Sequence, residues 1–159
     1  MVRERMLDVC KYPLLLLILL YLIFIVMPTG GSVRAFTEVS EPIAMRAREE
    51  RLESVSRQGF QQTYGIHWDD LEGVMLYVNG FRFSVEEVLL IQVASLNQVD
   101  EVRDMIEYRI GERLKEFGNH LPEQAAFLEE ARIIVRGTYI FLAIGPNAEE
   151  FITIFLNNL

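Results

Sequence analysis

The sequence predicts a transmembrane helix followed by one α+β domain, and three observations lead to this prediction. The 22 residues from Tyr12 to Val33 carry no charge, and about 20 apolar residues cross a bilayer core as a helix. Two pairs of short apolar, β-branched segments each flank a turn that contains glycine, which is typical of β-hairpins. Two helical segments separate these pairs. The predicted order ααββααββα therefore favours a four-stranded antiparallel sheet packed with helices.

The apolar segment predicts export of the domain. Arg3, Arg5 and Lys11 precede it, as the positive-inside rule expects at a cytoplasmic end. Residues 1–11 are then a cytoplasmic tail and residues 12–33 a single-pass anchor, with the C-terminal domain outside the cell. Cleavage after Ala35 is the alternative, since small residues stand three and one positions before that bond, and it would secrete the domain.

After the anchor, residues 34–41 are expected to be a linker and residues 42–159 one extracytoplasmic domain. Pro42 suits a first helical turn, because the N–H that it lacks has no partner there. A charged helix from Pro42 to about Ser56 should follow, then a short helix over Arg57–Tyr64 that Gly65 ends.

Strand composition marks the segments on either side of Asn79-Gly80, and the second is apolar on both sides of its pleat, so both faces of the sheet should be covered. Asn97, or Ser95 with Gln98, caps the longest helix. The remaining elements are predicted in this order: strands 74–78 and 86–94, helices 99–117 and 122–130, strands 132–136 and 138–144 about Gly137, and a last helix from Pro146.

Charge and cysteine content exclude some classes of protein. Residues 34–159 hold twelve Lys or Arg against 21 Asp or Glu, a difference of −9, so this domain repels nucleic-acid phosphates. Cys10 is the one cysteine of the sequence, which rules out a disulfide within the chain and a nucleophilic cysteine after the apolar segment.

The sequence contains no motif that names a reaction: it lacks a nucleophile elbow, a P-loop and a dinucleotide fingerprint. The two side chains of a carboxylate doublet such as Glu86-Glu87 point in different directions on a strand or a helix. They therefore cannot act together on one bond of a substrate. We expect no metal site and no cofactor. The histidine–acid pairs His67 with Asp69 and His120 with Glu123 are the only candidates for acid–base work.

Several segments in a fixed order together resemble the bacterial family known as domain of unknown function 4358, over about residues 43–157. These segments are Tyr64-Gly65-Ile66, Glu87-Val88-Leu89-Leu90-Ile91, the long helix from Val99, Leu121-Pro122-Glu123-Gln124 and Gly137-Thr138-Tyr139-Ile140. The resemblance implies an exported α+β domain, often lipoprotein-anchored and mostly from Gram-positive anaerobes. It implies no activity, since the family has no assigned site residues. The family's lipobox cysteine is missing here, where Thr29 to Ser32 stand instead.

The leading hypothesis is a non-enzymatic binding or assembly module of the cell envelope, held in the lipid bilayer by residues 12–33. Its partner would be an envelope component or another protein. The proposed binding surface is the edge around Tyr64, Trp68, Leu121 and Tyr139, because aromatic residues near turns tend to make contacts. The alternatives are a small envelope enzyme that uses one of the histidine–acid pairs, and a purely structural subunit.

Overall fold

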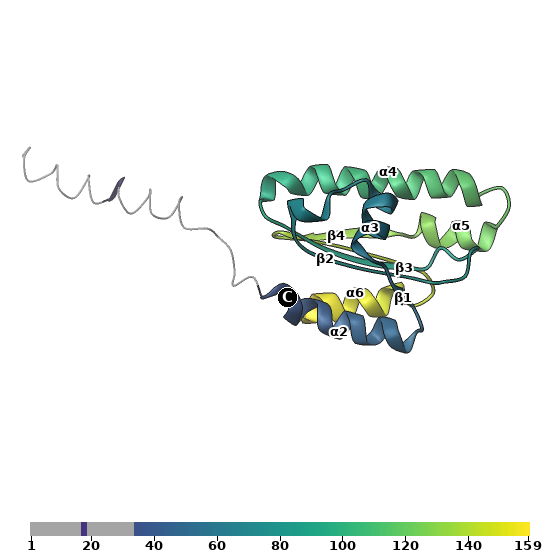
Figure 1. Cartoon of the computed structure of the whole chain (residues 1–159), viewed down its shortest axis with the longest axis horizontal. Coiled ribbons are helices and arrows are strands. Elements are labelled where there is room, and N and C mark those ends of the chain that lie inside the picture. Colours follow the sequence, from purple (N-terminus) through teal and green to yellow (C-terminus); the bar gives the residue numbers. More distant parts are fainter. Residues whose placement is uncertain (1–16, 19–33) are drawn as a thin grey trace, which may run out of the picture. The chain divides into compact units, whose positions relative to one another are not determined.

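The computed structural model describes residues 17–18 and 34–159 (Figure 1). The predicted anchor, residues 12–33, lies outside the described residues apart from Leu17 and Ile18. Among the described residues, no helix has both the length and the apolar composition to cross a membrane.

Residues 34–159 form a five-stranded antiparallel sheet in the order β1-β2-β3-β5-β4, with helices on both faces. The elements are α2 (Phe36–Glu49), β1 (Glu53–Ser54), α3 (Arg57–Tyr64), the 3₁₀ helix η1 (Trp68–Asp70), β2 (Leu71–Val78), β3 (Glu87–Val93), the 3₁₀ helix η2 (Leu96–Gln98), α4 (Val99–Phe117), α5 (Pro122–Glu129), β4 (Arg132–Arg136), β5 (Tyr139–Ile144) and α6 (Ala148–Asn157).

The sheet separates two hydrophobic cores, because successive side chains of a strand point to opposite faces. Helices α3, α4 and α5 cover one face, and α2 and α6 cover the other (Figure 1). In β3, Leu89 and Ile91 belong to the first core, whereas Val88 and Leu90 belong to the second. The prediction that both faces near this strand are covered is confirmed.

The α+β class and the antiparallel sheet are confirmed, but the sheet has five strands and not four. The missed strand, β1, is two exposed residues long and pairs with the end of β2, Glu53 with Val78 and Ser54 with Tyr77. A two-residue polar strand has no periodicity that a sequence pattern could reveal. Only its pairing partner makes it a strand.

The first helix spans Phe36–Glu49, so the predicted start at Pro42 and the predicted end at about Ser56 are both wrong. Residues 36–41 are helical instead of a linker, and β1 lies within the segment predicted as helix. Pro42 lies inside α2, where it removes one helical hydrogen bond at some cost in stability. Val39 and Ile43 on either side of it are fully buried. Their burial against the sheet offsets the cost of the proline.

Close packing fixes the start of α2 on the sheet. Tyr139 donates a hydrogen bond from its hydroxyl to the carbonyl oxygen of Arg34 at 2.7 Å, and the ring of Phe36 stacks on it at a centroid distance of 6.4 Å. Phe36 also covers Gly73 at a bulge in β2, where an added Cβ would lie 2.4 Å from the phenyl ring. Glycine at position 73 is therefore a requirement of this contact.

Most predicted helix boundaries agree with the structure. Gly65 ends α3 in the left-handed conformation, with φ of 72°. The side chains of Ser95 and Gln98 form a capping box around η2, which leads directly into α4. The last helix begins at Ala148, two residues after the predicted start at Pro146.

Candidate functional site

The one charged residue that is buried in the described part of the chain is Glu87, at the start of β3, with 1% of its side chain exposed. Its side chain lies on the sheet face that α3 and α4 cover, because it has the same parity along the strand as Leu89 and Ile91. A carboxylate in such a place needs partners, since burying an unpaired charge is very costly.

Three side chains supply these partners, and together with Glu87 we call them the Glu87 cluster: Tyr64, Arg109 and Arg113. The hydroxyl of Tyr64 donates to Oε1 of Glu87. Oε2 accepts from Nη2 of Arg109 and from Nη1 of Arg113, each at 3.1 Å. Both carboxylate oxygens are thus occupied by donors from within the fold.

Local structure explains why these donors meet. Arg109 and Arg113 are one helical turn apart on α4, in the line that also holds Ile106 and Phe117, both buried. Tyr64 is the last residue of α3. The guanidinium carbon of Arg109 lies 4.9 Å from the centroid of the Tyr64 ring.

The two arginines also bind backbone carbonyls of neighbouring segments. Arg113 donates to the carbonyl oxygen of Ser84 at 3.0 Å, and Arg109 donates to that of Thr63 at 3.5 Å. The cluster therefore joins α3, α4 and the segment that leads into β3.

Burial and charge shift the protonation equilibria of the cluster. Burial raises the pKa of Tyr64 well above its usual value, and the charge of Glu87 raises it further, so the phenol stays neutral and donates. Burial lowers the pKa of Arg113. At Arg109 burial also acts to lower the pKa, but Glu87 and Tyr64 together outweigh it, and the pKa is raised. Both guanidiniums remain charged at neutral pH.

A hollow of about 700 Å³ lies beside the cluster, and its lining includes Tyr64, Arg109 and Arg113. Glu112, Lys115 and Glu116 line it as well, so the charges of this lining and of Glu87 sum to zero. Both carboxylate oxygens of Glu87 already accept hydrogen bonds from these donors. This arrangement is suited to joining α3 and α4 to the sheet, and poorly suited to removing a proton from a substrate.

The raised pKa of Tyr64 predicts a loss of stability in alkali. The folded state holds this proton more tightly than the unfolded state, whose phenol titrates near pH 10. The free energy of unfolding should therefore be undiminished below pH 10 and fall above it, by up to about 1.4 kcal/mol per pH unit. Denaturant titrations of the full chain from pH 8 to about 11 measure this slope, which should be smaller for Tyr64→Phe. Tyr108→Phe, at an exposed tyrosine, should keep the wild-type slope; equal slopes for all three proteins would contradict the assignment.

The four residues predicted as a binding surface do not lie on one surface. Tyr64 and Tyr139 are both buried, in the first and the second core respectively, on opposite faces of the sheet. Trp68 is half-buried, with its ring edge-on to Phe60 at 5.6 Å. Leu121 is half-buried against the first core. The two tyrosines are engaged in contacts within the fold, and their predicted binding role stays a prediction.

The histidine–acid pairs have separate neighbours. Nδ1 of His67 lies 2.8 Å from Nε2 of Gln61, while Asp69 forms an ion pair with Arg57 at 3.5 Å. His120 and Glu123 are both exposed near the start of α5. In the described part of the chain, no three His, Cys, Asp or Glu side chains are close enough to hold a metal ion.

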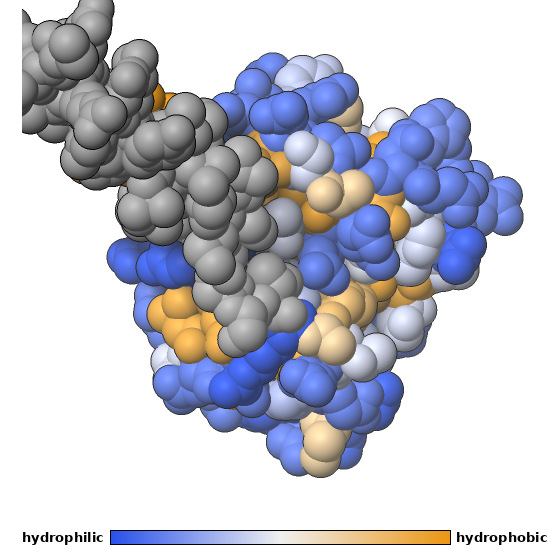
Figure 2. All heavy atoms as spheres, turned by 90° about the vertical axis from the view of Figure 1, so that its left-hand side faces the viewer, coloured by the Kyte–Doolittle hydropathy of each residue, from blue (hydrophilic) through white to orange (hydrophobic). Residues whose placement is uncertain are grey.

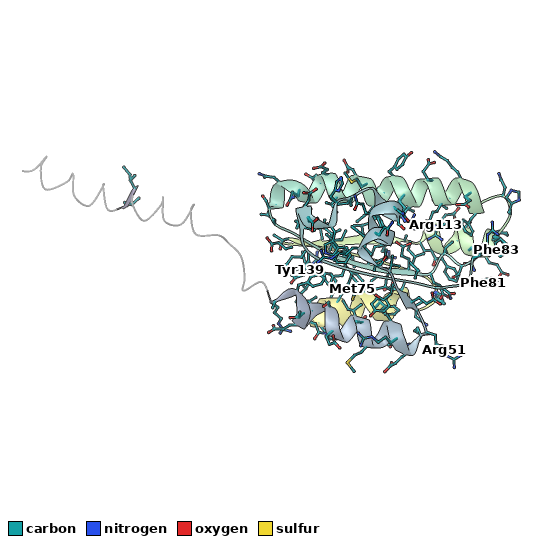
Figure 3. All side chains as sticks on the ribbon, viewed as in Figure 1. Arg51, Met75, Phe81, Phe83, Arg113 and Tyr139 are labelled. Atoms are coloured by element: carbon teal, nitrogen blue, oxygen red, sulfur yellow. The ribbon has the colours of Figure 1, made fainter. Side chains whose placement is uncertain are left out.

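Two exposed phenylalanines protrude from the connection between β2 and β3 (Figure 3). Phe81 is 66% exposed and Phe83 53%, and their rings meet edge-on at 5.8 Å. The guanidinium carbon of Arg82 lies 5.9 Å from the centroid of the Phe83 ring. We call residues 81–83 the aromatic tip. Hydrogen bonds from Phe81 N–H to Asn79 Oδ1 and from Ser84 N–H to the Phe81 carbonyl, both 2.9 Å, hold its backbone.

The sequence analysis identified neither the Glu87 cluster nor the aromatic tip. The apolar line of the long helix could have revealed the cluster, because Arg109 and Arg113 occupy two positions at helical spacing between Ile106 and Phe117. For the tip, the informative pattern is aromatic–basic–aromatic directly after the Asn79-Gly80 turn.

Comparison with known proteins gives one match. The profile of the family described as Domain of unknown function (DUF4358) matches residues 45–145, most of the predicted span of 43–157. No curated protein and no solved structure matches the chain.

Proposed function

The chain belongs to the DUF4358 family, and from this premise we propose that residues 34–159 are a non-enzymatic binding module of the cell envelope, held outside the cell by a transmembrane helix over residues 12–33. The family description names no activity, and the chain's own surface supports the proposal. The aromatic tip is the observation that supports the proposal, because its two large apolar side chains are exposed to solvent on a turn whose backbone is held by hydrogen bonds.

Aromatic and arginine side chains are the commonest anchors of protein–protein contacts. At the aromatic tip they are combined within three residues, whereas Glu87, the buried carboxylate, is saturated by internal donors. This contrast supports binding over catalysis.

The position of the aromatic tip in the described body also favours a partner. The tip and the start of α2 lie at opposite ends of this body (Figures 1 and 3). Figure 2 faces the end where α2 starts, and hydrophilic residues dominate the surface visible there. The chain enters this body at the start of α2, the end opposite to the tip.

Charge indicates the chemistry of the partner. Arg82 is a cation on a domain whose formal charge is −9, and its guanidinium lies against the ring of Phe83. A fitting partner is a protein with an apolar pocket that acidic side chains border, because such a pocket attracts Arg82 and buries both phenylalanines.

Protease treatment of intact cells tests the location. The domain should be digested in intact cells, and its survival until lysis would refute the proposal.

Site-specific photo-crosslinking tests the binding surface. A photoreactive residue at position 83 of the full chain in living cells should give a discrete protein adduct that Phe81→Ser and Arg82→Glu abolish. The matched control is position 108, where Tyr108 on α4 is 71% exposed, more than Phe83. Absence of an adduct at position 83, or the same adduct from position 108, would contradict the assignment of the surface.

A further inference from the structure

Strand β4 lies at one edge of the sheet, and in the described part of the chain its only strand neighbour is β5. The backbone groups on its other side have no strand partner there, and the Val135 carbonyl accepts a hydrogen bond at 2.9 Å from the side chain of Arg136, which a pairing strand would replace. The opposite edge is β1, which offers two residues, whereas β4 offers five, and its three central residues are apolar and half-buried.

The sequence of β4 is nearly the same in both directions: Arg132-Ile133-Ile134-Val135-Arg136. We propose that a second copy of this chain pairs its β4 with this strand, antiparallel about a twofold axis at Ile134, so that two five-stranded sheets become one. A twofold interface brings the same patch of both copies together and so must be complementary to itself. Here Ile134 lies opposite Ile134 of the partner subunit, and Ile133 opposite Val135 of the partner subunit. Such pairs of β-branched side chains stabilise antiparallel strands.

The same register places Arg136 of the partner subunit opposite Arg132, and like charges in that position repel. The structure contains a compensating feature, which we call the acidic hollow: a space of about 610 Å³ beside the start of β4, whose lining includes Glu129, Glu130, Glu149 and Arg132. Three carboxylates surround one guanidinium there, and Glu149 lies 3.8 Å from Arg132. The net charge of −2 attracts a second guanidinium.

The other face of the sheet has a hollow of about 360 Å³ beside β4. Its apolar part is lined by Ile110, Leu114, Leu128 and Ile133, and charged side chains border it. Residues directly opposite each other on antiparallel strands point to the same face. Val135 of the partner subunit would therefore lie next to Ile133 and cover this hollow. A second copy thus covers apolar side chains on one face of the sheet and supplies a guanidinium to the acidic hollow on the other.

Charge variants at exposed positions test the proposal. Sedimentation of the full chain in detergent should show a reversible dimer, and Arg136→Glu should raise its dissociation constant at least about tenfold, which corresponds to about 1.4 kcal/mol. Adding Glu149→Arg to that variant returns the net charge at each hollow to its wild-type value and should restore the dimer. Arg48→Glu makes the same change in charge on α2 and should have no effect. A wild-type chain that stays monomeric would overturn the proposal. A dimer that Arg136→Glu leaves unchanged would do the same, and it is the result expected if the two copies pair through residues 12–33.

A crosslink provides a second, geometric test. In a Cys10→Ser background, Ile134→Cys places one thiol beside the twofold axis, opposite the same thiol of the second copy. A short bismaleimide should therefore link the two chains. Met45→Cys, at an exposed position on α2, is the control and should not be linked. Equal linkage at both positions, or linkage at position 45 alone, would contradict the β4 pairing.

Discussion

Replacing Glu87 with Ala is expected to lower the free energy of unfolding by about 3–5 kcal/mol. The substitution leaves the guanidiniums of Arg109 and Arg113, with 24% and 17% of their side chains exposed, without the carboxylate that compensates their charge. It also leaves the hydroxyl of Tyr64 without its acceptor. Removing one member of a buried ion pair costs far more than the pair contributes, because the remaining charge is desolvated and unpaired.

Denaturant unfolding of the full chain in mild detergent, followed by the fluorescence of Trp68, measures this loss. Glu72→Ala, at an exposed position of β2, is the matched control and should stay within about 0.5 kcal/mol of wild type. The triple variant Glu87→Leu, Arg109→Met, Arg113→Met should recover most of the stability, since it removes the charges together. If Glu87→Ala were no worse than Glu72→Ala, the cluster would not join the helices to the sheet.

Replacing Phe155 with Ala is expected to cost about 3–5 kcal/mol as well, for a different reason. Phe155 is fully buried, and its ring stacks on that of Phe141 with 4.6 Å between centroids and 13° between planes. Phe141 lies on β5, so this contact attaches α6 to the sheet. Truncation removes the ring and leaves a cavity that the rigid strand cannot fill.

The adjacent residue provides the control for this prediction. Leu156 follows Phe155 on α6 and is 42% exposed, so Leu156→Ala should change the free energy of unfolding by no more than about 0.5 kcal/mol. The same denaturant titration compares both variants. Similar losses for the two would contradict the assignment of the Phe155–Phe141 contact as the one that attaches α6 to the sheet.

Neither large effect could be predicted from the sequence. Glu87 stands at the start of an apolar strand as one half of a carboxylate doublet, a pattern typical of an exposed strand end. Its burial depends on Arg109 and Arg113, which are more than twenty residues away along the chain. The predicted surface around Tyr64 and Tyr139 was likewise based on a local pattern, since both aromatics stand near turns. Packing decides which face of the sheet each one meets.

What the sequence determined by itself is the α+β class, the family, and the order and nature of most elements. Hydrophobic periodicity, turn residues and caps are local features, and they specify α3, α4, the β4–β5 hairpin and the capping box at Ser95 correctly. The tertiary structure alone decided the fifth strand, the start of α2 at Phe36, the burial of Glu87 and the exposure of Phe81 and Phe83. The first three depend on contacts between distant segments, whose free energy outweighs the local preference of the residues involved; the exposure of the two phenylalanines follows from where the rest of the chain packs.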